Sequence, residues 1–232
     1  MLFPWVGMLE QVRLADVFVH YDDVQYSKGS FVNRVQIKTA EGMQWMTVPL
    51  RELHLGQRIA DVQVGPMQEW VDKHLDLLVR SFAGAPHEED AIGLARGVYA
   101  EGHEQLGPLA RASLMALVRY FGLNEGRRFV DVQELGIAGD SSQRVLDVVQ
   151  RVGGTVYVTG HGASRYLDHH LFDAASVQVE YMDYRCDPYQ QGHGLFTPYV
   201  SGLDLVAYCG RAGLRNIASQ TLTWKEFVHE SR

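Results

Sequence analysis

The sequence predicts an α/β fold, in which a layered sheet of mostly parallel strands carries a helical insertion or cover in the middle of the chain. Three observations support this prediction. The last third alternates short β-branched runs with amphipathic helical patterns, as at 145–152 followed by 155–159. The middle, about 69–123, repeats apolar residues at helical spacing. The first fifty residues hold short strand-like runs. Such alternation is typical of a sheet with some parallel pairing.

In the first part of the chain, a short buried strand is expected at 16–21, because its apolar run is brief and ends in polar residues. Met8, Leu9, Val12 and Leu14 precede it at near-helical spacing. The runs 33–38 and 44–50 alternate on either side of Glu41-Gly42, which predicts a hairpin.

In the middle, the apolar residues of 69–82 fall on one side of a helix that also carries His74, which we interpret as packed or half-exposed. Pro108 suits the first turn of a second helix that ends at Phe121, before Gly122. In the last third, we expect strands at 130–135, 155–159 and 177–180. Helices are expected to start at Ser141 and Ser201, with Asp140 or Ser141 capping the first and Ser201 the second.

The chain is expected to form a single domain over 1–232. Its 232 residues lie between one and two domains at roughly 150 residues each. The composition shifts only weakly, around 84–90, so the helical segment at about 69–123 is interpreted as a cover or an insertion.

Composition and charge narrow the class of partner. Hydrophobic residues make up 46% of the chain and charged residues 21%, which is ordinary globular composition. The formal net charge of −7 argues against nucleic acid and favours a small-molecule substrate, with room for a local anion pocket. No run of about 18 apolar residues and no secretory signal are present, so we expect a cytoplasmic protein without membrane insertion. The two cysteines are expected to be reduced. The oligomeric state is left open between a monomer and a homodimer.

A polar segment after the first strand is the leading candidate site. It spans 21–34, and its polar residues are Tyr21, Asp22, Asp23, Gln25, Tyr26, Lys28, Asn33 and Arg34. Ligands of open α/β sheets bind beyond the carboxyl ends of strands. A carboxylate there can act as a base, orient an amine or hold Mg²⁺, and Lys28 and Arg34 can bind an anion. Neighbouring residues of an extended chain point to opposite sides, so one of the two aspartates is expected to face the ligand. The alternative is a polar turn with a local salt bridge.

A second candidate is the glycine-rich turn after the 155–159 strand. It reads Thr159-Gly160-His161-Gly162-Ala163-Ser164-Arg165, and its backbone N–H groups could bind an anion, with His161 titrating near neutral pH. Arg165 stands where a dinucleotide fingerprint has its third glycine, so that motif is absent, and a tight turn explains the glycines equally well. The histidines lack the spacing of a zinc site, and no metal ligands are assigned.

Several blocks of the sequence resemble the WbqC-like family of bacterial proteins. They include Phe3-Pro4-Trp5-Val6-Gly7, the run from Ala15 to Lys38 with its Tyr21-Asp22-Asp23-Val24-Gln25 and Asn33-Arg34, Trp45 to Leu50, Ser141 to Asp147, and Tyr157 to Asp168. The resemblance covers nearly the whole chain. It implies a bacterial cytoplasmic protein linked to O-antigen, lipopolysaccharide or other surface-glycan pathways, and it supports the 21–34 segment as the site.

The sequence departs from that family in two places. Relatives carry several residues before the Phe-Pro block, whereas this chain begins inside it, which leaves open a truncated first strand or a misassigned start. The family's turn is closer to Gly-Pro-Gly, where this chain has Gly160-His161-Gly162. Among parallel folds, a Rossmann-like or nucleotidyltransferase-like arrangement is favoured by analogy, although the paired-histidine motif of the latter is missing.

Two functional hypotheses follow. The first is a transferase of surface-glycan or nucleotide-sugar metabolism that moves an acyl or aminoacyl group onto an amino sugar. Asp22, Asp23 and Lys28 would then be catalytic, and a nucleotide or an acyl donor would be required. The second is a non-catalytic nucleotide-sugar-binding component of a biosynthetic complex, in which aromatic side chains such as Trp45 stack on a ring.

Overall fold

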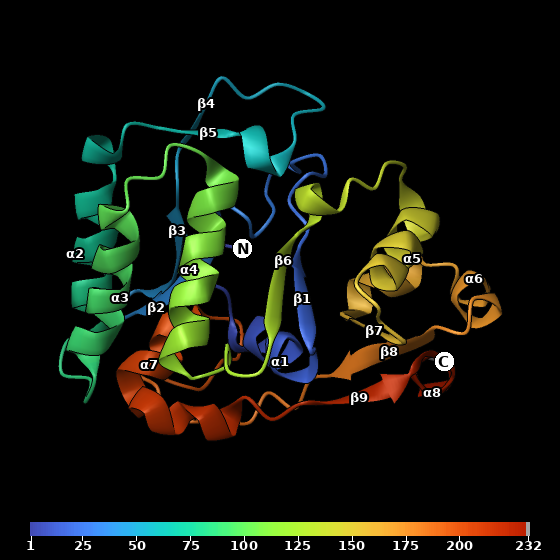
Figure 1. The fold of residues 1–232 in the computed structure, drawn as a ribbon. Helices are drawn as coiled ribbons and strands as arrows, with labels where there is room; N and C mark the ends of the chain where they lie inside the picture. Colours follow the sequence, from blue (N-terminus) through green and yellow to red (C-terminus); the bar gives the residue numbers. More distant parts are fainter. Residues whose placement is uncertain (231–232) are drawn as a thin grey trace. The chain divides into compact units, whose positions relative to one another are not determined.

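The computed structural model describes residues 1–230, which fall into two compact units (Figure 1). Unit 1 comprises Met1–Leu9, Asp22–Asn124 and Cys186–Ile217. Unit 2 comprises Glu10–Tyr21, Glu125–Arg185 and the chain from Ala218 onward. Both units are therefore assembled from stretches that are distant in the sequence, and each is described by itself. The expectation of a single domain stays a prediction.

Unit 1 is built from helices packed on a hairpin. The helices are α2 (Val71–Phe82), α3 (Glu88–Ala100), α4 (Leu106–Tyr120) and α7 (Gly202–Cys209). The hairpin joins β2 (Arg34–Thr39) to β3 (Gly42–Thr47), and a short antiparallel pair joins β4 (Leu50–Arg51) to β5 (Gln63–Val64). Figure 1 shows α3 between α2 and α4, and α3 also packs on α7.

The core of unit 1 follows from the helical spacing of its apolar residues. Leu78 and Phe82 lie one turn apart on α2 and are fully buried, as are Leu109 and Leu117 on α4. Burying each such side chain contributes roughly 1.5–3 kcal/mol, which outweighs the weak intrinsic preference of a short helix. The opposite face of α2 carries exposed charged residues, so this helix has one apolar and one polar side.

His74 connects three elements of this unit. Its Nδ1 lies 2.9 Å from the Tyr99 hydroxyl on α3, and its Nε2 lies 3.1 Å from the Thr47 carbonyl at the end of β3. The imidazole is buried, and loss of hydration lowers its pKa from 6.5 to about 4. A neutral His74 thus holds α2 against α3 and the hairpin, as a packed residue.

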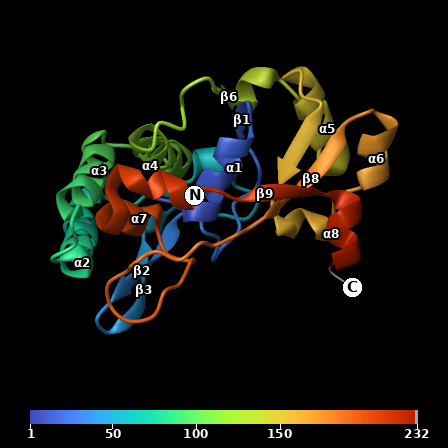
Figure 2. The ribbon, with the colours of Figure 1, turned by 90° about the horizontal axis from the view of Figure 1, so that it is seen from below.

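A long loop at 186–200 is held against the hairpin by a buried lysine. Figure 2 shows this loop beside β2 and β3. Lys38 Nζ donates to Gln191 Oε1 at 3.1 Å and to the carbonyls of Gly194 and Leu195. An ammonium group has three donors, so the loop satisfies all of them. The loop ends where Ser201 N donates to the Gln36 carbonyl and Ser201 Oγ accepts from Leu203 N, which caps α7.

A buried carboxyl group lies just beyond that cap. Asp204 is 3% exposed, and its Oδ1 accepts a hydrogen bond of 2.8 Å from the Tyr189 hydroxyl. Loss of hydration raises the pKa of Asp204 from 3.8 to about 6, while the hydrogen bond and the charge of Lys38 act in the opposite direction. The loop is therefore tied to the hairpin by a buried ammonium group and to α7 by a buried carboxyl group.

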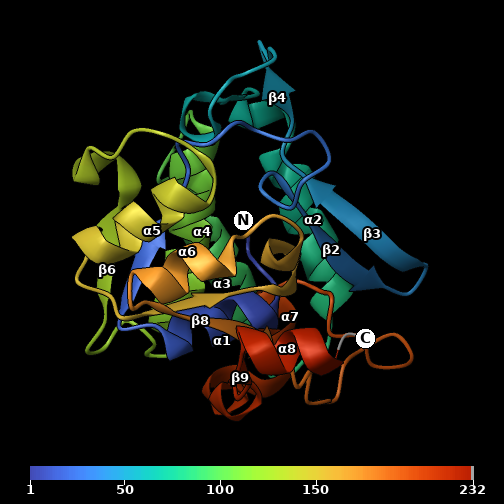
Figure 3. The ribbon, with the colours of Figure 1, turned by 90° about the vertical axis from the view of Figure 1, so that its right-hand side faces the viewer.

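Unit 2 holds the parallel strand pairs. The strand β1 (Val17–His20) pairs in parallel with β6 (Arg128–Asp131), with Val17 opposite Arg128. In a second sheet, β7 (Val156–Thr159) pairs in parallel with β8 (Gln178–Asp183), which pairs antiparallel with β9 (Gln220–Thr223). The helices are α5 (Ser141–Arg151), α6 (His169–Ala174), α8 (Trp224–Glu230) and the C-terminal part of α1 (Val6–Leu14). Figure 3 shows α5 and α6 next to each other beside β8.

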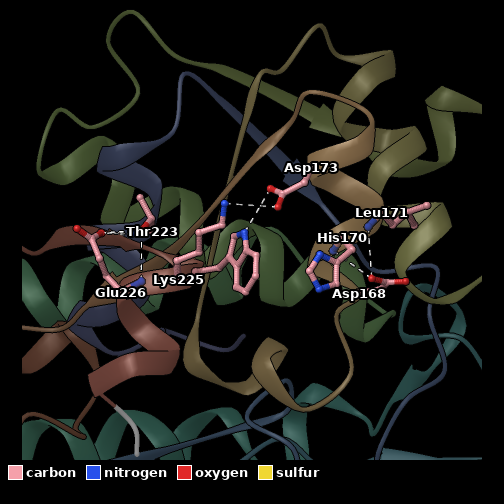
Figure 4. Close-up of polar contacts among 8 residues, drawn as sticks. Asp168, His170, Leu171, Asp173, Thr223, Lys225 and Glu226 are labelled. Carbon is pink, nitrogen blue, oxygen red and sulfur yellow. Dashed lines mark hydrogen bonds and ion pairs between the residues drawn. The ribbon is translucent and has the colours of Figure 1, made fainter.

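The N-terminal ends of α6 and α8 are fixed by side-chain caps, which Figure 4 shows. Asp168 Oδ1 accepts from the backbone N–H groups of His170 and Leu171 and so caps α6. Thr223 and Glu226 form a reciprocal pair at the start of α8: Glu226 Oε2 accepts from Thr223 N, and Thr223 Oγ1 accepts from Glu226 N. This is a capping box, which the sequence Thr-Trp-Lys-Glu indicates.

A buried carboxyl also joins the three stretches of unit 2. Glu10 on α1 is 1% exposed, and its Oε2 accepts from Ser219 Oγ at 2.6 Å. Ser219 Oγ in turn accepts from the backbone N–H of Arg185 at 2.9 Å. Burial raises the pKa of Glu10, although the bonds from Ser219 and Ala218 oppose that shift. One carboxyl therefore connects α1, the end of β8 and the start of β9.

The sequence prediction of a mixed α/β fold with some parallel pairing is confirmed. The hairpin around Glu41-Gly42, the helices α2, α4, α5 and α7, and the strands β1, β7 and β8 occur where they were expected, within a few residues. The expected strand at 130–135 is shorter, because residues 132–135 form a 3-10 turn after β6. The strands form small sheets with both parallel and antiparallel pairs, and the layered Rossmann-like or nucleotidyltransferase-like arrangement stays a prediction. Within residues 1–230, no helix is long and apolar enough to cross a membrane.

The shifted pKa values of His74 and Asp204 predict opposite dependences of the free energy of unfolding on pH. As the pH falls from 6.5 towards 4, the unfolded chain takes up a proton on His74 before the folded chain does, so stability is lost. As the pH rises from 3.8 through 6, the unfolded chain releases the Asp204 proton first, so stability is lost in that direction. The two contributions therefore partly cancel between pH 4 and pH 6.

Asp204→Asn should remove one of these trends. The variant keeps an oxygen for Tyr189, so its free energy of unfolding should rise more steeply than that of the wild type from pH 4 to pH 6.5. At pH 7 it should be more stable by about 1–3 kcal/mol. Urea denaturation across this range checks both, with Asp76→Asn, an exposed acid on α2, as the control. Parallel profiles for Asp204→Asn and the wild type would contradict the expectation.

Candidate functional site

The backbone of the 22–34 segment is fixed by a neighbouring segment of unit 1. Ala60 N donates to the Asp22 carbonyl at 2.9 Å, Ile59 N donates to Val24 O at 2.9 Å, and Tyr26 N donates to Gln57 O at 2.8 Å. These bonds run antiparallel, although the segment forms only an isolated bridge at Gln25 and no strand. The first half of the segment is therefore an ordered chain whose side chains have defined directions.

The carboxylate of Asp22 points at helix α4. Its Oδ2 accepts a bond of 2.8 Å from Arg111 Nη2, and the two side chains are 13% and 29% exposed. Gly107 lies one turn before Arg111, and a Cβ there would stand 2.8 Å from the Ala60 Cα and 3.1 Å from Asp22 Oδ2. The absence of a side chain at Gly107 allows α4 to approach Asp22 closely.

Asp23 belongs to a second group of charges beside the first. Arg58 Nε donates to Asp61 Oδ2 at 2.6 Å, and both side chains are about half exposed. The pKa of Arg58 is raised, mainly by this hydrogen bond and the charge of Asp61, and further by the charges of Asp23 and Asp22. Asp22, Asp23 and Asp61 thus surround two guanidinium groups, an arrangement suited to polar or cationic groups of a ligand.

Two of the predicted substrate-binding residues are occupied by bonds within the fold. The Tyr26 hydroxyl donates to Asn33 Oδ1 at 2.9 Å, and Asn33 Nδ2 donates to the Val48 carbonyl at 3.0 Å. Both side chains are buried, and burial raises the pKa of Tyr26. They hold the segment on the hairpin, and their contact with a substrate stays a prediction.

The remaining polar residues of the segment lie nearer the surface. Gln25 and Lys28 are exposed. Arg34 Nη2 donates to the Gly29 carbonyl, and its guanidinium carbon lies 4.2 Å from the centroid of the Trp45 ring. Lys28 therefore has the greatest freedom to reach an anion, whereas Arg34 is already positioned on an aromatic face.

The glycine-rich turn and Tyr21 belong to unit 2. The buried Thr159 ends β7, and 161–165 form a 3-10 turn in which Gly162 and Arg165 are exposed. His161 Nε2 donates to the Met182 carbonyl at 2.6 Å, which fixes the imidazole against β8. The Tyr184 hydroxyl lies 3.0 Å from the position that a Cβ on Gly160 would take, so Tyr184 accounts for that glycine.

Tyr21 is positioned by a cation of the same unit. The guanidinium carbon of Arg144, on α5, lies 4.9 Å from the centroid of the Tyr21 ring, and Arg144 Nε donates to the Ile137 carbonyl at 3.2 Å. The structure thus gathers Asp22, Asp23, Tyr26, Asn33 and Arg34 in unit 1. It places Tyr21, Thr159, Gly160, His161 and Arg165 in unit 2.

Sequence reasoning missed Arg111, Gly107 and Arg58. Gly107 and Arg111 are four residues apart and therefore share one face of α4, a spacing that the sequence displays. Nothing in the sequence indicates that this face meets Asp22, 89 residues earlier. As for metals, the part of the chain that the structure describes holds no group of three or more His, Cys, Asp or Glu arranged to bind an ion.

Comparisons with known proteins agree with the sequence blocks described above. The model of the WbqC-like protein family matches residues 1–216, and the chain belongs to that family. A relative is the uncharacterized protein Rv1507c of Mycobacterium tuberculosis, which is 33% identical over 210 residues, covering 89% of this chain and 90% of the relative. No solved structure matches the chain.

Gly107→Ala should disturb the Asp22 site. The new Cβ would meet backbone at 2.8 Å, so either α4 or the Ala60 segment must move, at a cost of about 1–3 kcal/mol in the free energy of unfolding. Urea denaturation measures this cost. The matched control is Gly97→Ala on α3, where a Cβ meets nothing within 4 Å. That control should gain about 0.5–1 kcal/mol because alanine favours a helix. Equal effects of the two substitutions would contradict the close approach of α4.

Proposed function

We propose that the protein is a group-transfer enzyme of bacterial surface-glycan or nucleotide-sugar metabolism, which moves an acyl or aminoacyl group onto the amine of an amino sugar. Membership of the WbqC-like family supports the setting. The observation that carries the chemistry is the largely buried Asp22 carboxylate, held at 2.8 Å by Arg111 and bordered by a helix that lacks a side chain at Gly107.

The carboxylates of the site suit an amine acceptor. Asp22 keeps a fixed direction because Arg111 holds one of its oxygens and Ala60 binds its backbone. A positioned carboxylate accepts hydrogen bonds from an amine and orients its lone pair. Asp23 follows Asp22 directly in the segment, and its charge acts on Arg58. It is the residue we assign to proton uptake.

The proposed reaction is an ordinary acyl transfer. The amine nitrogen attacks the carbonyl carbon of an activated acyl donor, a thioester or an acyl phosphate anhydride. A carbon–nitrogen bond forms, and the bond from the carbonyl carbon to the leaving group breaks. The leaving group departs with the electron pair, and the amine proton passes to Asp23. Lys28, exposed on the same segment, would stabilise the negative charge of the donor.

The reaction does not depend on the glycine-rich turn. Anion binding by Gly160, Gly162 and Arg165 stays a separate prediction for unit 2. His161 is engaged with the Met182 carbonyl, so we assign it no proton transfer.

Substitutions at Asp22 and Asp23 test the proposal. The purified protein is incubated with UDP-linked amino sugars and a panel of acyl thioesters and aminoacyl adenylates, and products are detected by mass spectrometry. Asp22→Asn and Asp23→Asn should each lower kcat by about 10²–10⁴-fold while preserving the melting temperature within a few degrees. Asp76→Asn, at an exposed residue of α2, is the control and should retain turnover. Full activity in both Asp22→Asn and Asp23→Asn would overturn the proposal.

A second candidate function is a non-catalytic nucleotide-sugar-binding component. The observation that favours it is the same ion pair, since a carboxylate that already accepts from a guanidinium is better placed to bind than to deprotonate. Thermal-shift measurements separate the two functions. Stabilisation by both donor and acceptor, with product formation, indicates the transferase. Stabilisation by a nucleotide sugar alone, without turnover of any donor, indicates the binding component.

A further inference from the structure

One face of the β2–β3 hairpin is exposed although it carries large apolar side chains. The register places Gln36 opposite Trp45, Arg34 opposite Thr47 and Lys38 opposite Met43. Directly opposite residues share a face, and alternate residues take the other one. Val35, Ile37 and Met46 are buried on the core side. On the outer side, Trp45 is 42% exposed and Met43 is 41% exposed.

The Trp45 ring is the centre of an ordered cluster. Phe31, 49% exposed, lies with its ring centroid 5.7 Å from that of Trp45. Arg34 stacks its guanidinium over Trp45 at 4.2 Å and is itself held by the Gly29 carbonyl. Leu2 N donates to the Phe31 carbonyl, which fixes the backbone beside the ring. Three planar groups are therefore presented to solvent in a defined arrangement, which we call the Trp45 platform (Phe31, Arg34, Trp45).

Hydrogen-bonding groups border this platform. Gln36 lies directly across from Trp45 and is half-buried, and its side-chain amide makes no hydrogen bond within residues 1–230. The 186–200 loop borders the face on the side of Lys38 and presents Leu195 and Tyr199, which are 93% and 61% exposed. The Tyr199 ring lies 5.7 Å from that of Trp5. An aromatic surface next to an amide that reaches solvent is a binding surface for a ligand with one apolar face and polar edges.

We infer that the Trp45 platform binds a saccharide ring, with the apolar C–H face of a pyranose on Trp45 and its hydroxyl groups on Gln36 and Arg34. A pyranose matches the mixture of surfaces, since it is apolar on one face and carries hydroxyls around its edge. The inference deepens the proposed function and rests on it for the choice of a sugar, because it places the ring of the acceptor on a surface of unit 1.

Charge argues against a phosphate-rich ligand on the same face. Lys38, the other cation that this face receives from β2, is 6% exposed and gives all three donors to the 186–200 loop. Arg34 already gives Nη2 to Gly29. The chain has a formal net charge of −7, and the donors of Lys38 and one donor of Arg34 are already engaged. Little positive charge is therefore left on this face to neutralise phosphates. The platform therefore favours a neutral ring over a nucleotide.

The Trp5–Tyr199 pair bears on how far the binding surface extends beyond the Trp45 platform. Ser201 N bonds to the Gln36 carbonyl, so the end of the loop lies beside β2 on the edge away from β3. Backbones bonded in this way are about 5 Å apart, which puts the backbone at Ser201, two residues after Tyr199, roughly 10 Å from that of Trp45. We expect a disaccharide to bind more tightly than a monosaccharide for this reason.

Titration of the full-length protein with sugars tests the inference. The probes are methyl N-acetylglucosaminide, chitobiose and maltose, with UMP and adenosine for comparison, and binding is followed by calorimetry and tryptophan fluorescence. Trp45→Ala should weaken saccharide binding by about tenfold or more, equivalent to 1.4 kcal/mol or more. Trp45→Phe should restore most of the affinity, and Gln36→Ala should weaken it at unchanged melting temperature. Leu55→Ala, an exposed apolar residue of unit 1, is the control and should bind as the wild type does.

The binding measurements would overturn the inference in any of these cases: no saccharide binds the wild type at millimolar concentration, Trp45→Ala and Gln36→Ala bind as tightly as the wild type, or only UMP or adenosine depends on Trp45. Asp22→Asn separates this inference from the proposed function. If that variant binds sugars normally, and no acyl donor is ever consumed by the wild type, the platform stands and the transfer reaction fails. If transfer proceeds equally well in Trp45→Ala, the platform fails and the reaction stands.

Discussion

The ammonium group of Lys38 imposes a constraint on much of unit 1. A buried cation must keep its donors satisfied, because an unpaired charge in the interior costs several kcal/mol. Lys38 meets this requirement with acceptors from one loop, Gln191, Gly194 and Leu195. A loop without helix or strand is thereby fixed against a hairpin. The same loop carries Tyr189 to Asp204, so the position of α7 depends on it as well.

The candidate site also contains a largely buried charge that needs a partner. Asp22 is largely buried, and its charge is tolerated because Arg111 reaches it from α4. Tyr26 and Asn33 form hydrogen bonds with each other and with the Val48 carbonyl, so they hold the segment on the hairpin. This arrangement separates supporting residues from exposed ones such as Lys28. A site built in this way keeps its shape when a ligand leaves, because its fixed groups are bound to the protein itself.

Local features of the fold could be predicted from the sequence, and distant contacts could not. The turn at Glu41-Gly42, the stop at Gly122 and the cap at Ser201 each involve neighbours in the chain, and each is present. The helix α3 was not anticipated individually, because Gly93 and Gly97 weaken its pattern and tertiary packing of residues such as Ala95 stabilises it. Arg111 was missed as a partner of Asp22 because this contact is also set by the tertiary fold. Helical spacing shows which residues share a face of a helix, but it does not show which segment that face meets. His161, in the glycine-rich turn, contacts the Met182 carbonyl of β8, and the sequence did not indicate this contact.

The parallel pairing of β1 with β6 has a consequence for the order in which the chain acquires its structure. Val17 pairs with Arg128, so more than a hundred residues must leave the ribosome before the first strand has a partner. Closing so long a loop is entropically costly, and contacts of such large separation slow folding. The hairpin and the helices α2, α3 and α4 of unit 1 lie within that interval and can form while β1 is still unpaired. Unit 2 is complete only after Ser219 reaches Glu10, near the end of synthesis. Until β6 is synthesised, β1 presents unpaired edges, and a nascent chain is most open to misassembly and to chaperones at this stage.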